Sequence, residues 1–152
     1  KKLRELPALG RLGIQVFEPH PGWAVAKGSE RKPVVRLINP GLGVEFSVSS
    51  EVASGSMSLW RGKIRARLRA SGIAIRRSRL MRIDRIAGTL MTGTMSDASG
   101  KPTHDYSEVV LKTQRRLIRF IWVNRHGDAR ANRAFIAALK TALIAKTQGG
   151  RR

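Results

Sequence analysis

Cysteine is absent from the 152-residue chain, and its absence excludes several kinds of protein. Without cysteine there is no disulfide framework, no thiolate ligand for a metal and no thiol nucleophile. Long apolar runs are missing as well. The longest run inside a predicted strand is Phe120–Val123, far short of the roughly 20 residues of a membrane-spanning helix. The length suits a single domain with one core.

Acidic residues are also few. Ten Asp and Glu stand against thirty Lys and Arg, which gives a formal net charge of +20 and a pI near 11.9. Such a surplus of one sign repels itself in a compact chain, so a polyanionic partner is the economical explanation. RNA, DNA and an anionic lipid surface all qualify, and a solvated basic surface without a ligand is the alternative. The 21 Arg and 9 Lys favour phosphate recognition, although a GC-rich genome also enriches Arg.

Turn residues and hydrophobic periodicity divide the chain into a basic arm at 1–12, one domain at 13–148 and a basic tail at 149–152. The first extended segment is predicted from Gly13 to a turn at 19–22, after which Trp23 starts the next segment. Further extended segments are predicted at 33–39, 43–51, 73–83, 87–97, 106–114 and 116–125. The C-terminal segment is predicted to be a helix that begins at Asp128 and stops at Gly149. Its apolar face comprises Phe135, Leu139, Ala142 and Leu143.

The stretch 58–73, SLWRGKIRARLRASGI, allows two interpretations. Apolar or small residues alternate with cations from Trp60 to Ala70, as in a half-buried strand, but five neighbouring cations on one face would repel each other. A helix places Met57, Trp60, Ile64 and Leu68 on one stripe, and Ala, Leu, Arg and Lys favour helix. The flanking Ser and Gly residues also suit a helix, which we therefore predict over 58–71.

The predicted order is three strands, a helix, four strands and a helix. This indicates an α+β fold, with an antiparallel sheet of about six to seven strands flanked by two helices. The layout resembles the PsbP-like fold family, which includes the extrinsic photosystem II protein, DcrB-like lipoproteins and a Ran-binding nucleotide-release factor. The resemblance covers roughly 12–147 and is carried by 13–23, by ASGI at 70–73, by the paired strands of 106–125 and by the terminal helix. It implies an α/β/α sandwich and a non-catalytic accessory role on a larger assembly. The high positive charge departs from the family.

The positive charge is concentrated in discrete segments. Residues 57–85 contain ten basic residues and one acid, and residues 112–133 contain seven basic residues and one acid. The intervening residues 86–111 carry a net charge of −2. This distribution predicts a basic patch for a polyanion. The candidate binding residues are Arg61, Lys63, Arg65, Arg69, Arg76, Arg77, Arg79, Arg115 and Arg116.

Residues suited to catalysis are scarce. His104 and Asp105 are adjacent in sequence, and we interpret them as partners in loop hydrogen bonds; His20 and His126 we interpret as turn residues. The three histidines have no zinc-site spacing. NPGLGVEF lacks the third glycine of a dinucleotide fingerprint, and SGKPT lacks the first glycine of a phosphate loop. The sequence therefore predicts no enzyme, no cofactor and no metal.

Two functions remain. The first is an RNA-contacting subunit of an organellar ribosome or other ribonucleoprotein. Trp60, Trp122, Phe46 and Phe135 are predicted core residues, which leaves no base-stacking platform and favours contact with RNA phosphates and neighbouring proteins. The second is an accessory subunit of a respiratory or photosynthetic membrane complex, docked on acidic subunits or anionic lipid. The chain begins with Lys1 rather than Met, which is compatible with removal of a targeting peptide. We therefore expect an organelle, the mitochondrion first and the chloroplast as the alternative.

Overall fold

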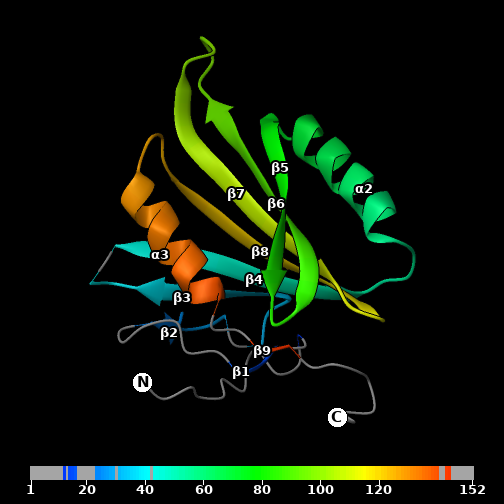
Figure 1. Cartoon of the computed structure of the whole chain (residues 1–152). Coiled ribbons are helices and arrows are strands. Elements are labelled where there is room, and N and C mark those ends of the chain that lie inside the picture. Colours follow the sequence, from blue (N-terminus) through cyan, green and yellow to red (C-terminus); the bar gives the residue numbers. More distant parts are fainter. Residues whose placement is uncertain are drawn as a thin grey trace.

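The centre of the protein is a seven-stranded antiparallel sheet (Figure 1). The computed structural model describes residues 12, 14–16, 23–29, 31–41, 43–140 and 143–144. Across the sheet the strand order is β2-β3-β4-β8-β7-β6-β5. These strands are β2 (Ala24–Val25), β3 (Val34–Asn39), β4 (Val44–Val52), β5 (Ile73–Ile83), β6 (Ile86–Ser96), β7 (Pro102–Lys112) and β8 (Arg116–Arg125). The predicted α+β fold and its antiparallel sheet are confirmed.

Each face of the sheet carries one helix, α2 (Met57–Ala70) or α3 (Ala129–Leu139). Alternation along β7 separates two buried layers, because successive side chains point to opposite faces. Val109 packs in the layer that contains α3, whereas Val110 packs in the layer that contains α2. The α3 layer is the larger and includes the fully buried Phe46, Phe120, Trp122 and Phe135. The result is the predicted sandwich.

Residues 57–70 form a helix and not a strand. The Ser56 side chain caps its start by accepting a hydrogen bond of 3.2 Å from the Leu59 backbone N–H. Gly72 follows the helix with φ of +83°, a conformation that glycine adopts without steric cost. Ile64 and Leu68 are the buried residues of α2. The expected apolar stripe is therefore present, although Trp60 is only half-buried at its edge.

The prediction of one continuous C-terminal helix is wrong. α3 ends at Leu139, and β9 (Leu143–Ile144) pairs antiparallel with β1 (Ile14–Val16) in a separate two-stranded sheet. Residues 143–144 obtain their hydrogen-bonding partner from the other end of the chain, a contact with no local signal in the sequence. Ala142 and Gly149, expected on the helix, lie outside the described residues.

Leu12 belongs to the core, although the sequence placed it at the end of the basic arm. Its exposed fraction is 3%, and it lies in the same buried cluster as Trp23. The other expected arm residues, 1–11, and the expected tail, 149–152, lie outside the described residues.

Candidate anion-binding surfaces

The outer surface of α2 is a cationic face. We use the name α2 face for its five exposed basic residues, Arg61, Lys63, Arg65, Arg67 and Arg69. The helix contains no acidic residue, so none of these charges is neutralised by an ion pair within the helix. Because Ile64 and Leu68 turn inward, the remaining circumference of α2 presents its charges to solvent.

Two contacts fix part of the α2 face. The Arg65 guanidinium donates to the Ser78 hydroxyl on β5, which ties the helix to the edge strand. Lys63 lies over the indole of Trp60, with Nζ 4.7 Å from the ring centroid. The Trp60 Nε1–H in turn donates to the Ser54 carbonyl at 2.6 Å. The remaining cations of α2 are exposed and available for a partner.

A β-bulge sends the next group of arginines to the opposite face of the sheet. Ile75 pairs with Gly93 and Arg77 pairs with Thr92, so Arg76 is the extra residue in β5. Arg77 and Arg79 therefore lie with Phe135 and Ile136 of α3, and not with α2. The structure therefore divides the predicted basic patch, with Arg77 and Arg79 on the side of the sheet opposite α2.

Arg115 lies in the turn between β7 and β8, and Arg116 is the first residue of β8. The Arg116 guanidinium donates to the Ser50 hydroxyl at 3.0 Å, and the Arg115 carbonyl accepts from the Ala53 backbone N–H at 2.9 Å. The nine predicted polyanion-binding residues thus fall at three separate places. That any of them binds a polyanion stays a prediction.

A groove runs between α3 and the edge of the sheet, on the face opposite α2. We call it the α3 groove. Its apolar end has a volume of about 190 Å³ and is lined by Arg77, Arg79, Leu90, Thr92, Ser107, Asn132, Phe135 and Ile136. An adjoining hollow of about 310 Å³ shares Arg77, Thr92, Ser107 and Asn132, and adds Arg76, Gly93, Thr94, Asp105 and Tyr106. The sequence indicated the arginines but not Thr92, Ser107 or Asn132, because no local pattern connects β6, β7 and α3.

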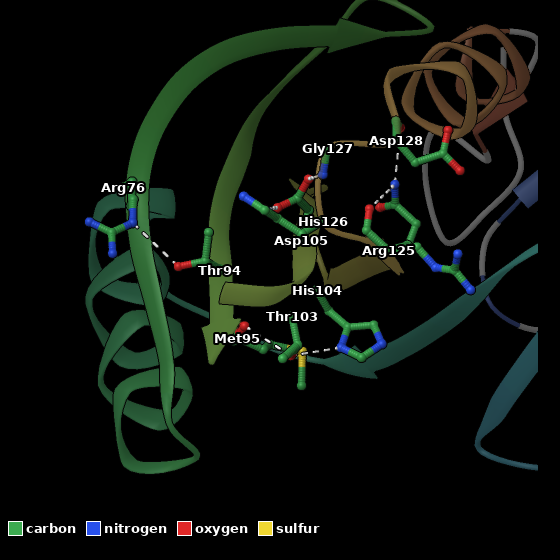
Figure 2. A network of polar contacts seen from close by, with 11 residues as sticks. Arg76, Thr94, Met95, Thr103, His104, Asp105, Arg125, His126, Gly127 and Asp128 are labelled. Carbon is green, nitrogen blue, oxygen red and sulfur yellow. Dashed lines mark hydrogen bonds and ion pairs between the residues drawn. The ribbon is translucent and has the colours of Figure 1, made fainter. Parts of the chain in front are cut away.

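Several hydrogen bonds border the polar end of the α3 groove (Figure 2). Asp105 accepts from His126 Nδ1 at 2.7 Å and from the Gly127 backbone N–H at 2.8 Å. Arg76 donates to the Thr94 hydroxyl at 3.3 Å. His104 lies within β7 rather than in a loop, and its Nδ1 is 3.0 Å from the Thr103 hydroxyl. These contacts join β5 to β6 and β7 to the turn before α3. No cluster suited to a metal ion occurs among the described residues.

A buried charged network that the sequence did not reveal lies between the sheet and α2. Glu108 is fully buried and accepts hydrogen bonds from the Tyr106 hydroxyl at 2.6 Å and from Arg119 Nη2 at 2.9 Å. A second bond joins Arg119 Nε to the same carboxylate. Burial and then the Glu108 charge raise the pKa of Tyr106. Burial alone would lower the pKa of Arg119, but its bonds to Glu108 reverse the effect and raise it. The network joins β7 to β8 within the sheet.

A further hollow of about 560 Å³ lies between the β3–β4 turn and the end of β8. Glu45, Arg125 and Asp128 all contribute to its lining, so its charge is mixed. It is less suited to an anion than the α3 groove.

Over the part of the chain that the structure describes, no helix has the length and apolar character needed to cross a membrane.

Solved structures with folds similar to this one include two that each match most of the chain. The cyanobacterial PsbP (CyanoP) of Synechocystis sp. PCC 6803 matches 94% of this chain and 91% of its own, with a TM-score of 0.63 and 12% sequence identity. A Bacteroides thetaiotaomicron protein matches 97% of this chain with a TM-score of 0.60 and 11% identity, and this chain spans about half (49%) of its length. No protein-family model and no curated protein sequence matches the chain.

These neighbours overturn the first functional reading of the sequence. The prediction of an RNA-contacting ribosomal subunit in the mitochondrion is wrong, because the shared fold is that of a PsbP protein and neither neighbour is described as ribosomal, RNA-binding or mitochondrial. That reading depended on net charge, and positive charge by itself does not distinguish phosphate from carboxylate. The order of strands and helices was the better guide. The chain has a PsbP-like fold.

Proposed function

We propose that this protein is a non-catalytic accessory subunit of a photosynthetic or respiratory membrane complex, which docks through the α2 face on acidic protein subunits. The observation that carries the proposal is the run of five exposed cations on a 14-residue helix without an acid. The similarity of the fold to a cyanobacterial PsbP supports the accessory role.

An acidic protein surface fits the α2 face better than a lipid surface does. A helix that lies in a membrane interface inserts its apolar side among the lipids. In α2 that side is occupied, because Ile64 and Leu68 are buried against the sheet. Leu59 is the helix residue that leaves a large apolar side chain substantially exposed, at 50%. The helix therefore offers arginine guanidinium groups without an exposed apolar side, and guanidinium groups are suited to pairing with carboxylates.

The Synechocystis neighbour is compatible with a chloroplast or cyanobacterial location. A photosynthetic complex is therefore the first place to test the proposal, and native membranes of the source cell are the appropriate material.

The experiment is co-sedimentation of the purified protein with these membranes over a salt series. We expect binding at low salt that is progressively lost as ionic strength rises, because exposed charges are screened beyond about 8 Å at physiological salt. Neutralising Arg61, Arg67 and Arg69 to Gln should abolish most of this binding, since these side chains are exposed and have no hydrogen bond to another element within the described part of the chain.

The matched control neutralises three exposed arginines elsewhere, Arg31, Arg130 and Arg133, and changes the net charge by the same amount. We expect this control to bind like the unaltered protein. Equal loss in both variants would show that binding follows net charge alone and would refute a specific α2 face. Equally strong salt-sensitive binding to vesicles of phosphatidylglycerol without protein would refute an acidic subunit as the partner.

A further inference from the structure

The α3 groove combines two free cations with an apolar floor. Arg77 and Arg79 are exposed, and within the described chain neither guanidinium has an acidic partner at ion-pair distance. Below them lie Leu90 and Phe135, whose exposed fractions are 4% and 1%. A fully hydrated inorganic anion gains nothing from such a floor. The lining instead fits a carboxylate attached to a short apolar group, because the planar guanidinium binds a carboxylate through two parallel bonds.

A buried acceptor in the wall adds a second requirement. Among the described residues, the buried Asn132 Oδ1 has no hydrogen-bond partner, although Asn132 lines both parts of the groove. A buried acceptor without a donor costs free energy, so a ligand that brings an N–H or O–H group would satisfy it. An ionised carboxylate cannot do this, because it only accepts. The ligand therefore needs a donor beside its carboxylate.

The size of the apolar end limits what can enter. A volume of about 190 Å³ is below the range of about 300–1,000 Å³ for drug-sized ligands. It is enough for one apolar side chain with its carboxylate. The adjoining polar hollow offers space for a chain that continues away from that residue.

One common group carries a carboxylate, an adjacent N–H and an apolar side chain: the last residue of a polypeptide. We infer that the α3 groove binds the C-terminus of a partner protein that ends in an apolar residue. Arg77 and Arg79 hold the terminal carboxylate, Asn132 Oδ1 accepts from the terminal backbone N–H, and the side chain packs on Leu90, Phe135 and Ile136. The groove is on the side of the sheet opposite α2, so binding of a C-terminus here and the proposed docking through the α2 face are tested independently of each other.

The test is calorimetric titration of the full chain with the tripeptide N-acetyl-Ala-Ala-Leu as the free acid and as the C-terminal amide. The amide should bind at least about tenfold more weakly, because it loses the charged hydrogen bonds. The double substitution Arg77→Gln and Arg79→Gln should weaken the acid to a similar extent. Arg130→Gln, an exposed α3 position that does not line the groove, is the matched control and should leave the affinity unchanged.

A second pair of probes tests the role of Asn132. A depsipeptide, in which an ester oxygen replaces the terminal N–H, should bind more weakly than the tripeptide to the unaltered chain and equally well to Asn132→Ala. Backbone amide shifts of Leu90 and Ser107 during titration of the unaltered protein locate the ligand without any substitution.

Several results would overturn the inference. Equal affinity for acid and amide would exclude recognition of the carboxylate. Equal affinity for octanoate would show a site for free amphipathic acids, and equal affinity for N-acetyl-leucine would show a site for single amino-acid derivatives rather than polypeptides. Shifts confined to α2 would place binding at the wrong surface.

Discussion

Replacing Glu108 by Gln removes the negative charge at the centre of the buried network between the sheet and α2. The Glu108 side chain has an exposed fraction of 0%, whereas that of its partner Arg119 has 19%. Losing one member of a buried pair costs about 3–5 kcal/mol when the other charge is left without compensation. Arg119 retains some contact with water and Gln retains an acceptor, so we expect a loss of about 2–3 kcal/mol. For a chain of this length that corresponds to a decrease in Tm of about 5–10 °C.

The assay is urea unfolding followed by tryptophan fluorescence, applied to a double-mutant cycle of Glu108→Gln and Arg119→Met. If the two groups form a pair, the double variant is more stable than the sum of the single losses indicates, because neither charge is left buried alone. Tyr106→Phe is the control that removes one hydroxyl and keeps the ion pair. Additive losses within about 0.5 kcal/mol would refute the coupling. So would a Glu108→Gln variant as stable as the original protein.

Further predictions concern Tyr106 in the same network, two glycines and the cap of α2. Tyr106 is the single tyrosine of the chain, and its pKa is raised first by burial and then by the Glu108 charge. The contribution of Tyr106 to the free energy of unfolding should therefore be complete below the ordinary pKa of 10.0 and should decline as pH rises above it. Absorbance at 295 nm should show tyrosinate only when the protein unfolds. Gly93→Ala would place a Cβ 2.1 Å from the Ala74 carbonyl oxygen in β5, so we expect a loss of about 2–3 kcal/mol or more. Gly62→Ala, an exposed helix position with nothing within 4 Å, should instead gain about 0.5–1 kcal/mol in the same denaturation assay; a reversed order would contradict the geometry. Ser56→Ala should cost about 1 kcal/mol by removing the cap of α2, and Ser56→Asp should retain most of that stability.

Local sequence predicted most of the elements because their signals are local. The alternation in β4 and β8 follows the two faces of the sheet, and the Arg-rich segment after Ser56 is helical as its composition indicated. The same reasoning failed at residues 143–144. The helix-like composition of the segment that contains them was outweighed by pairing with residues 14–16, more than a hundred positions earlier.

The sequence predicted which charged residues belong to the candidate sites, but not the face of the sheet on which each of them lies. The sequence identified Arg76, Arg77 and Arg79 as exposed cations, but one extra residue in β5 decided which face each arginine occupies. A shift of one residue in a strand moves every following side chain to the other face, and periodicity does not show where such a bulge occurs. No local pattern in the sequence indicated that Asn132 belongs to a site, because the other residues that line the groove with it come from β6 and β7.

The sequence by itself determined most of the elements, the fold class and the surplus of positive charge, because helix capping, alternation and net charge are properties of neighbouring residues. Only the tertiary structure decided how that charge is divided, with α2 on one face of the sheet and the α3 groove on the other. The physical reason is that pairing register and helix packing bring together residues far apart in the chain, and these contacts decide which cations meet solvent and which border an apolar groove.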